Sequence, residues 1–289
     1  MVDNTRKGVS LVVATLGDHD IRPLLNSLEV QSCEKYECII IDQSEKRVIE
    51  PIIASYRNIK YLHSTRRGNS FNRNVGIKNA EMPIIAFPDD DCYYSPDVIE
   101  KVIHFFDAHP NIDGISGNWL NSETGELVIG GRPGAYVNAF NAWTSLTNIT
   151  FFIRIEMVKK VNGYNEHFGL GSGVFEGGEE SELMLQFLEN GAKIIYTSEI
   201  RVWHYLDKSV LNTAKKHLDY EEAWGALFRK WSFSGRYRGV TFLTFLFLLL
   251  KSFIGSFYWF FRGNVKKASF YLMKNRYRLR GWFKYGNVF

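Results

Sequence analysis

Four short apolar segments early in the 289-residue sequence, at residues 9–15, 37–42, 59–63 and 83–87, constrain the fold most strongly. The residues between them have helical spacing, and strands that alternate with helices predict a mostly parallel sheet covered by helices. We also expect strands at 112–119, 148–153 and 193–196. The core-facing residues of the first helix are Ile21, Leu24, Leu25 and Leu28.

Two later helices have recognisable ends. Ser95-Pro96-Asp97 is typical of an N-cap followed by proline at the first helical position. Another helix is expected from about residue 179 to 190, ending at Gly191, because glycine is favoured just after a helix. The expected inward-facing residues of the helix after Pro96 are Ile99, Val102, Ile103 and Phe106.

The cysteines and the N-terminus indicate a cytoplasmic location for the main part of the chain. Cys33, Cys38 and Cys92 form neither an even set nor a C-x-x-C pair, so disulfides and structural zinc are not expected. The apolar run 9–16 is short and lacks a cleavage site, which indicates a buried strand rather than a signal peptide. We expect the protein at the cytoplasmic face of the inner membrane.

Charge is distributed unequally along the chain. All 31 Asp and Glu lie in residues 1–222, whereas 13 of the 35 Lys and Arg lie in residues 223–289. A basic, aromatic-rich region indicates an anionic partner, phospholipid or nucleic acid. Its density of Phe and Leu favours lipid over nucleic acid. We therefore expect a catalytic domain at 1–222 and a helical membrane-attachment region at 223–289.

Residues 240–261 are the most apolar part of the chain, with Lys251 as their single charge. Their length permits a bilayer span of about 33 Å at about 1.5 Å per residue. Basic residues on both flanks argue against a simple span. Small and polar residues at helical spacing favour a helix lying in the membrane interface, with this polar stripe at the headgroups. A true span and a helix buried in the protein or in a dimer interface remain the alternatives. The stripe consists of Thr241, Thr244, Lys251, Ser252, Gly255, Arg262 and Lys266.

The sharpest chemical signal is Pro88-Asp89-Asp90-Asp91, directly after an apolar strand. In an open α/β sheet, ligands bind beyond the carboxyl ends of the strands. Three adjacent carboxylates repel one another unless a cation lies between them, so we expect a divalent metal that holds a diphosphate. The alternative is that these aspartates merely decorate a turn.

Other polar motifs are less specific. Gly177-Gly178-Glu179-Glu180 opens a helix, where glutamates serve as dipole partners or as a general base. Arg66-Arg67-Gly68-Asn69-Ser70 and the following Arg73 suit phosphate or a nucleobase, or form a solvated face. His204 completes a metal site or is a satisfied core residue.

Together these segments resemble family 2 glycosyltransferases of the GT-A fold, from about residue 8 to 206. Ser10–Thr15 is similar to the opening strand, Ile41-Asp42-Gln43-Ser44 to the nucleoside-binding turn with glutamine replacing a second aspartate, and Arg73-Asn74-Val75-Gly76 to the Arg-Asn-x-Gly helix. The resemblance implies that Glu180 is the catalytic base and Glu179 its support. It implies the metal ligands Asp89, Asp91 and His204 and the nucleotide-sugar contacts Thr15, Asp42, Arg73, Asp89 and Asp90.

The implied reaction is one in-line displacement that transfers a sugar from a UDP- or dTDP-sugar, with inversion and with Mn²⁺ or Mg²⁺ at the departing diphosphate. The C-terminal region suits a lipid-linked glycan acceptor and the membrane surface. A nucleotidyltransferase acting on a sugar phosphate is the rival enzyme, although no Gly-rich, Lys-containing loop follows the first strand. A non-catalytic membrane-binding module is the third interpretation.

Overall fold

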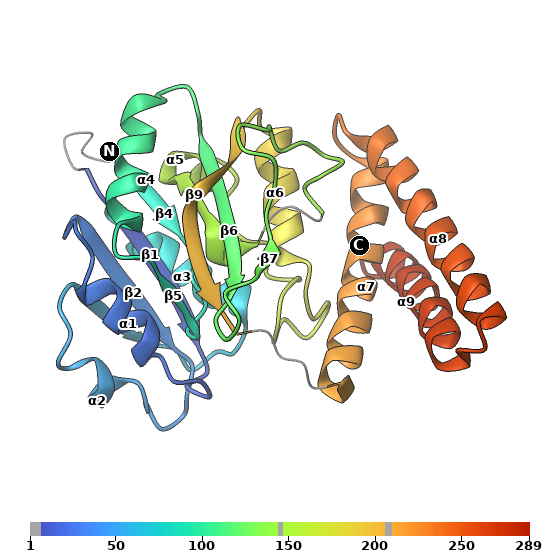
Figure 1. The fold of residues 1–289 in the computed structure, drawn as a ribbon, viewed down its shortest axis with the longest axis horizontal. Helices are drawn as coiled ribbons and strands as arrows, with labels where there is room; N and C mark the ends of the chain where they lie inside the picture. The colour runs from blue at the N-terminus through green and yellow to red at the C-terminus, as the bar shows by residue number, and fades with distance from the viewer. Residues whose placement is uncertain (1–6, 144–146, 206–209) are drawn as a thin grey trace.

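The computed structural model describes residues 7–143, 147–205 and 210–289, without the side chains of residues 210–213. A curled mixed sheet lies at the centre, with strand order β3-β2-β1-β4-β8-β6-β9-β5 and with β7 paired to β6. Figure 1 shows the sheet beside three long C-terminal helices. The architecture is the expected α/β fold with a C-terminal helical region.

The N-terminal half of the sheet is parallel. Its strands are β1 (Val9–Thr15), β2 (Tyr36–Asp42), β3 (Ile59–His63) and β4 (Ile84–Ala86). The remaining strands are β5 (Cys92–Tyr94), β6 (Gly114–Asn121), β7 (Leu127–Ile129), β8 (Phe151–Arg154) and β9 (Ile194–His204). Strand β8 runs antiparallel between β4 and β6, and β6 pairs in parallel with β9.

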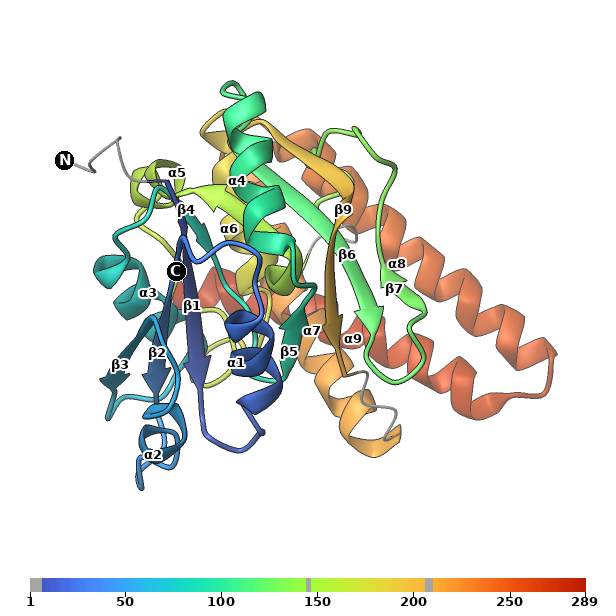
Figure 2. The same ribbon diagram turned by 60° about the vertical axis from the view of Figure 1, so that its left-hand side comes forward.

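Helices cover both faces of this sheet because side chains of a strand alternate between its faces. On β1, Leu11 and Val13 join the core under α1 (Arg22–Glu29) and α4 (Val98–Ala108). Val12 joins the opposite core, under α3 (Asn69–Asn79), α5 (Ile155–Lys160) and α6 (Glu179–Glu189). Figure 2 shows α1 and α4 in front of the sheet. Two short helices complete this part, α2 (Glu50–Ile53) and η1 (Asn148–Thr150).

The C-terminal region consists of α7 (Val210–Phe233), α8 (Arg238–Phe261) and α9 (Val265–Val288). A third core joins α6 to α7 and α8 through residues such as Leu185, Phe228 and Phe245. Between α6 and α7, buried Glu182 pairs with Lys230 and accepts a 3.1 Å hydrogen bond from Trp231 Nε1. The division expected at residue 222 therefore falls inside a helix that packs on the catalytic part, and it stays a prediction.

Several sequence-based boundaries were wrong in detail, and the strand expected at 112–119 is β6 at Gly114–Asn121. Helix α4 begins at Val98 with Asp97 at its N-cap, and Ser95 instead donates its hydroxyl to Asp97, so Ser95 is not the cap. The strand expected at 148–153 begins only at Phe151, because η1 occupies its first half. The strand expected at 193–196 continues to His204, since β6 pairs with residues 194–196 and, after an irregularity, again with residues 201–204.

Candidate active site

The carboxyl ends of β1 and β2 bring two of the expected residues together. Thr15 and Asp42 are neighbours in the parallel register, each the last residue of its strand. The Thr15 hydroxyl donates to Asp90, whereas the buried Asp42 carboxylate accepts from Tyr61 Oη at 3.0 Å and from the Ser44 amide at 2.8 Å. Thr15 and Asp90 are thus in direct contact, and Asp42 lies one strand away.

Asp89, Asp91 and His204 form one of two metal-binding candidates among the described residues, the other being Asp18, His19 and Asp90. Because β5 pairs with β9, Cys92 lies opposite His204, and this register brings the imidazole to Asp91. His204 Nε2 lies 2.9 Å from Asp91 Oδ1 and 3.7 Å from Asp89 Oδ2. One ligand atom from each of the three residues lies within 4.8 Å of the others. Two carboxylates and an imidazole suit a divalent cation.

The ionisation of this cluster follows from burial and pairing. Burial works to raise the pKa of Asp91, but the hydrogen bond and charge of His204 outweigh it, so the pKa is lowered. Burial works to lower the pKa of His204, and Asp91 outweighs it in turn, so that pKa is raised. The raised pKa of His204 favours an ion pair with Asp91, and a cation that took the place of the imidazole proton would have to displace it, because histidine binds metals as the neutral ring.

Arg73 connects the acidic loop to helix α6. Its buried guanidinium donates from Nη2 to Asp89 Oδ1 at 2.9 Å, and its Nη1 lies 3.4 Å from Glu179 Oε1. Helix α3 lies close against β1 at Gly76, three residues after Arg73, where a Cβ would lie 2.2 Å from Val12 Cγ1. The Arg-Asn-x-Gly pattern thus places a fixed positive charge between two acidic motifs.

Glu179 and Glu180 begin α6 after a sharp turn. Gly177 and Gly178 have φ values of 151° and 79°, which L side chains rarely adopt. Burial raises the pKa of Glu179, although Arg73 acts in the opposite direction. Burial, followed by the charge of Glu179, raises the pKa of Glu180 to about 8. A carboxyl group that titrates near neutral pH is suited to general-base catalysis.

Two side chains from the C-terminal helices reach this site, and no sequence motif marked them. The ring of Tyr220 from α7 covers Gly177, where a Cβ would lie 2.2 Å from its Cδ1. Burial, then the charges of Glu179 and Glu180, raise the pKa of Tyr220. Lys284 of α9 donates to the carbonyl of Val174, in the glycine-rich loop that leads into α6. These contacts depend on tertiary packing that local spacing cannot indicate.

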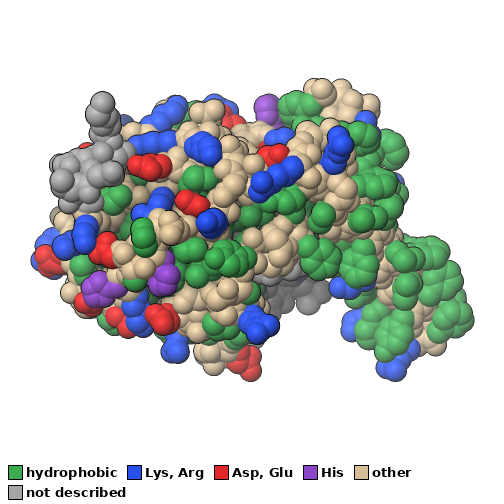
Figure 3. Space-filling model, turned by 90° about the horizontal axis from the view of Figure 1, so that it is seen from above, with side chains coloured by type: hydrophobic (Ala, Val, Ile, Leu, Met, Phe, Trp, Pro, Cys, Tyr) green, Lys and Arg blue, Asp and Glu red, His purple; other side chains and the backbone are tan. Residues whose placement is uncertain are grey.

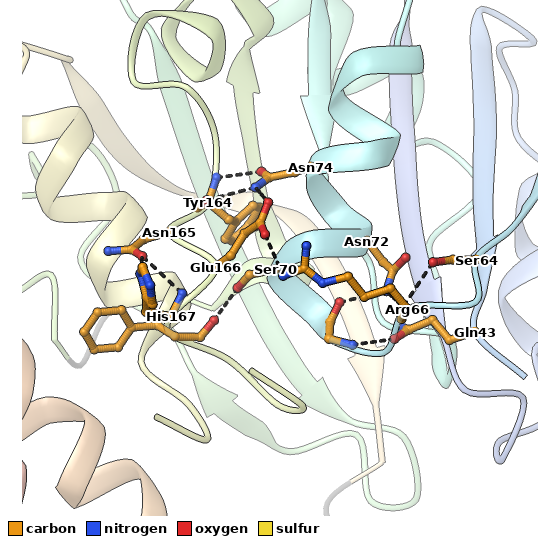
Figure 4. A network of polar contacts seen from close by, with 12 residues as sticks. Gln43, Ser64, Arg66, Ser70, Asn72, Asn74, Tyr164, Asn165, Glu166 and His167 are labelled. Carbon is orange, nitrogen blue, oxygen red and sulfur yellow. Dashed lines mark hydrogen bonds and ion pairs between the residues drawn. The ribbon is translucent and has the colours of Figure 1, made fainter. Parts of the chain in front are cut away.

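Other polar residues have mixed outcomes. His19, which was not predicted, has its Nδ1 3.3 Å from Asp90 Oδ1. Its position just after β1 could have marked it by the same strand-end argument. Gln43 accepts a hydrogen bond from the Gly68 amide at 2.9 Å, and Arg66 pairs with Glu166 at 2.9 Å. Figure 4 shows Gln43, Arg66 and Glu166 in this network. Arg67 pairs with Glu45 at the surface, so both arginines are engaged by carboxylates.

The family of the chain follows from a comparison with protein-family models. The model described as "Glycosyl transferase family 2" matches residues 10–160, which include the first four strands and the acidic loop. The chain belongs to this family. Family 2 membership makes it a glycosyltransferase and removes the support for a non-catalytic module. It also favours sugar transfer over nucleotidyl transfer.

Individual relatives are also named as glycosyltransferases. An uncharacterized glycosyltransferase of Haemophilus influenzae is 32% identical over 97 residues, which cover 33% of each chain. The poly(ribitol-phosphate) β-N-acetylglucosaminyltransferase TarS of Staphylococcus aureus is 30% identical over 108 residues, covering 35% of this chain and 19% of TarS. The matched segments thus span a third or less of these curated relatives.

Solved structures of S. aureus TarS support the GT-A fold. The structure of its residues 1–349 with UDP-GlcNAc has a TM-score of 0.65 at 18% identity, covering 81% of this chain and 69% of that one. The structure with UDP has a TM-score of 0.59 at 16% identity and covers 98% and 92%. At this identity the likeness concerns the fold, including the helical C-terminal region in the second case.

Proposed function

We propose that this glycosyltransferase moves a sugar from a UDP- or dTDP-sugar to a hydroxyl of a lipid-linked glycan, with inversion and with a divalent cation. The observation that carries the proposal is the pair of contacts that Arg73 makes with Asp89 and Glu179. It connects a candidate metal and diphosphate site to the helix that begins with two acidic residues. A transferase needs these two sites side by side, because the leaving group and the attacking hydroxyl react at one carbon.

Asp89, Asp91 and His204 would hold the cation, Mn²⁺ or Mg²⁺. Their donor set fits, and an imidazole ligand favours Mn²⁺, since Mg²⁺ prefers an all-oxygen shell. When bound, such a cation supplies positive charge to the departing diphosphate. Thr15, Asp42, Arg73, Asp89 and Asp90 would bind the nucleotide-sugar around it.

Glu180 would remove the proton of the acceptor hydroxyl, and Glu179 would support it. The Glu179 carboxylate is already engaged by Arg73, which supports a positioning role. Glu180 has the pKa of about 8 that suits a base near neutral pH. Inversion is the outcome of a single displacement by the acceptor at the anomeric carbon.

The donor and acceptor classes rest on the TarS structures and on the C-terminal region. The TarS structure contains UDP-GlcNAc, which supports a UDP-sugar as the first donor to test. The basic, apolar C-terminal region supports a membrane-associated acceptor at the cytoplasmic face of the inner membrane.

Product analysis tests the proposal. The purified chain is incubated with UDP- and dTDP-sugars, Mn²⁺ and a lipid extract as acceptor source, and the nucleotide products are separated by anion exchange. Nucleoside diphosphate with a glycosylated lipid is expected. A parallel incubation with UTP or dTTP and a sugar phosphate should release no pyrophosphate, and its release would instead favour the nucleotidyltransferase. A product with retained anomeric configuration would contradict the single displacement.

A further inference from the structure

Helix α8 carries a continuous apolar face that the described part of the chain leaves largely exposed. Six side chains at alternating intervals of four and three residues form this face, which we call the apolar stripe, and each is between 51% and 81% exposed. Figure 3 shows hydrophobic side chains gathered over the helical end of the molecule. By length and composition α8 is long enough to cross a bilayer. The stripe consists of Leu243, Phe247, Leu250, Ile254, Phe257 and Phe261.

The opposite side of α8 is polar and faces protein. Thr241, Thr244, Ser252 and Ser256 are buried. Ser256 Oγ donates to the Ala268 carbonyl at 2.9 Å, and Ser252 Oγ accepts from Arg278 Nη1 at 2.8 Å. The polar side chains expected at the lipid headgroups are therefore mostly the packing face of α8. Lys251 and Arg262, in contrast, are exposed.

Helix α9 is attached to α8 along its length. Besides the contact near the turn, Asn275 Nδ2 donates to the Leu249 carbonyl at 2.9 Å and Arg278 Nη1 donates to the Leu248 carbonyl at 2.8 Å. The pairing of later α9 residues with earlier α8 residues makes this an antiparallel hairpin, visible in Figure 1. Any insertion of α8 must therefore carry α9 with it.

The composition of α9 opposes such an insertion. It has seven Lys and Arg and no acidic residue in 24 residues. A Lys or Arg placed at the centre of a membrane helix is unfavourable even on the most permissive scale. Arg278 is additionally paired with buried Glu221 of α7, which fixes the hairpin to the rest of the protein. A span by α8 would have to break these contacts.

The basic residues beside the apolar stripe indicate which kind of partner binds it. Exposed Lys251, Arg262, Lys266 and Lys267 lie on α8, on the turn and at the start of α9, and no acidic residue follows Glu222 in the sequence. An anionic lipid surface complements this charge. A second copy of the hairpin would instead bring like charges together across the contact.

We infer that the α8–α9 hairpin lies flat in the surface of an anionic bilayer, with the apolar stripe among the acyl chains and the basic residues at the headgroups, and that α8 does not cross. This inference deepens the proposed function, because it names the surface on which the enzyme meets its acceptor. Only the link to the acceptor rests on the proposed function; the membrane docking itself does not. Binding is measured without turnover, so the two can fail separately.

Vesicle flotation tests the docking face. The full chain should float with vesicles of phosphatidylglycerol and phosphatidylethanolamine, and much less with phosphatidylcholine or at high salt. Leu250→Glu should weaken this binding at least tenfold. Leu127→Glu is the matched control, because Leu127 on β7 is 58% exposed against 57% for Leu250. Circular dichroism verifies folding. Point variants are preferable to deletion, since α9 also contacts the glycine-rich loop.

Two results would overturn the docking face. One is equal binding by Leu250→Glu and the parent chain. The other is absence of vesicle binding together with a lipid-free dimer that Leu250→Glu dissociates, which would make the stripe a protein interface. Retained catalysis of a soluble acceptor in either case would leave the proposed function intact.

Cysteine labelling tests the orientation. In a Cys33→Ser background, Val265→Cys places a thiol at the hairpin turn and Leu127→Cys places one on the catalytic part. An impermeant maleimide applied to inside-out membrane vesicles should label both from the same side. Labelling of Val265→Cys only after the vesicles are opened would show that α8 spans, and would contradict the inference.

Discussion

Arg73 donates through Nη2 to Oδ1 of Asp89 across 2.9 Å, although the two residues come from different elements of the fold. The guanidinium is 3% exposed, whereas the Asp89 carboxylate is 39% exposed and remains open to a ligand. The second partner of Arg73, Glu179, is almost fully buried. Arg73 thus fixes the separation of the two acidic motifs from within the core.

Removal of Arg73 should therefore affect stability as well as activity. Arg73→Gln leaves the Glu179 carboxylate buried without its cation, and we expect a loss of about 3 kcal/mol in unfolding free energy. Urea denaturation measures it. Arg67→Gln is the control, since its surface pair with Glu45 is worth less than about 0.5 kcal/mol. Equal stability of the two variants would mean that Arg73 does not connect the motifs.

The pH dependence of turnover should report Glu180. Its pKa of about 8 means that the free enzyme holds this carboxyl group protonated at lower pH, so kcat/KM should rise with pH and level off above about 8. Glu180→Gln should reduce turnover about 10²–10⁴-fold and abolish this rise of kcat/KM with pH. Glu179→Gln should retain the rise of kcat/KM with pH. A larger loss in Glu179→Gln than in Glu180→Gln would reverse the two roles.

The same carboxyl group should destabilise the fold at high pH. Its folded pKa of about 8 exceeds the ordinary 4.5, so its stabilising effect is complete below 4.5 and is lost as pH rises through 8. Compared with Glu180→Gln, the parent chain should lose unfolding free energy across this window. Urea midpoints at pH 5 and pH 9 measure the difference, and an unchanged difference would contradict the raised pKa.

A close helix crossing predicts a stability defect in the C-terminal region. A Cβ at Gly281 of α9 would lie 1.8 Å from the Glu222 carbonyl oxygen of α7, and one at Gly225 would lie 1.9 Å from the Arg278 carbonyl oxygen. Gly281→Ala should cost about 1–3 kcal/mol by forcing the helices apart. Gly286→Ala is the control on the same helix, because its nearest neighbour is the end of the Arg229 side chain at 3.4 Å. Equal melting temperatures would show that the crossing is not tight.

Much of the sheet could be predicted from sequence, because each parallel strand is a short apolar run with its own turn signals. Strands β1 and β3 have the predicted bounds, and Asp89–Asp91 and Thr15 lie at the strand ends as expected. The position of His204 opposite Cys92 could not be predicted from the sequence, since it depends on the register of β5 and β9, two strands far apart in the chain.

The C-terminal region shows a different limit. Periodicity identified a polar side of α8 at Thr241, Thr244 and Ser252, but periodicity cannot distinguish water or headgroups from a neighbouring helix as its partner. The structure buries these side chains against protein and leaves the apolar side exposed. Tyr220 and Lys284 were missed for the same reason, because only packing brings α7 and α9 to the glycine-rich loop.

Turnover during a manganese titration tests the central claim most directly. Nucleoside diphosphate release is measured for the parent chain, for Asp91→Asn, and for Asp107→Asn as a control at an exposed pair with Lys7. The parent chain and the control should show saturable activation, and Mn²⁺ at about 100 times its dissociation constant should stabilise them by about 2.7 kcal/mol. Asp91→Asn should fold but lose at least about 100-fold in turnover and most of this stabilisation, since one charged ligand is missing. Full activity of Asp91→Asn, or of the parent chain in excess chelator, would contradict the account.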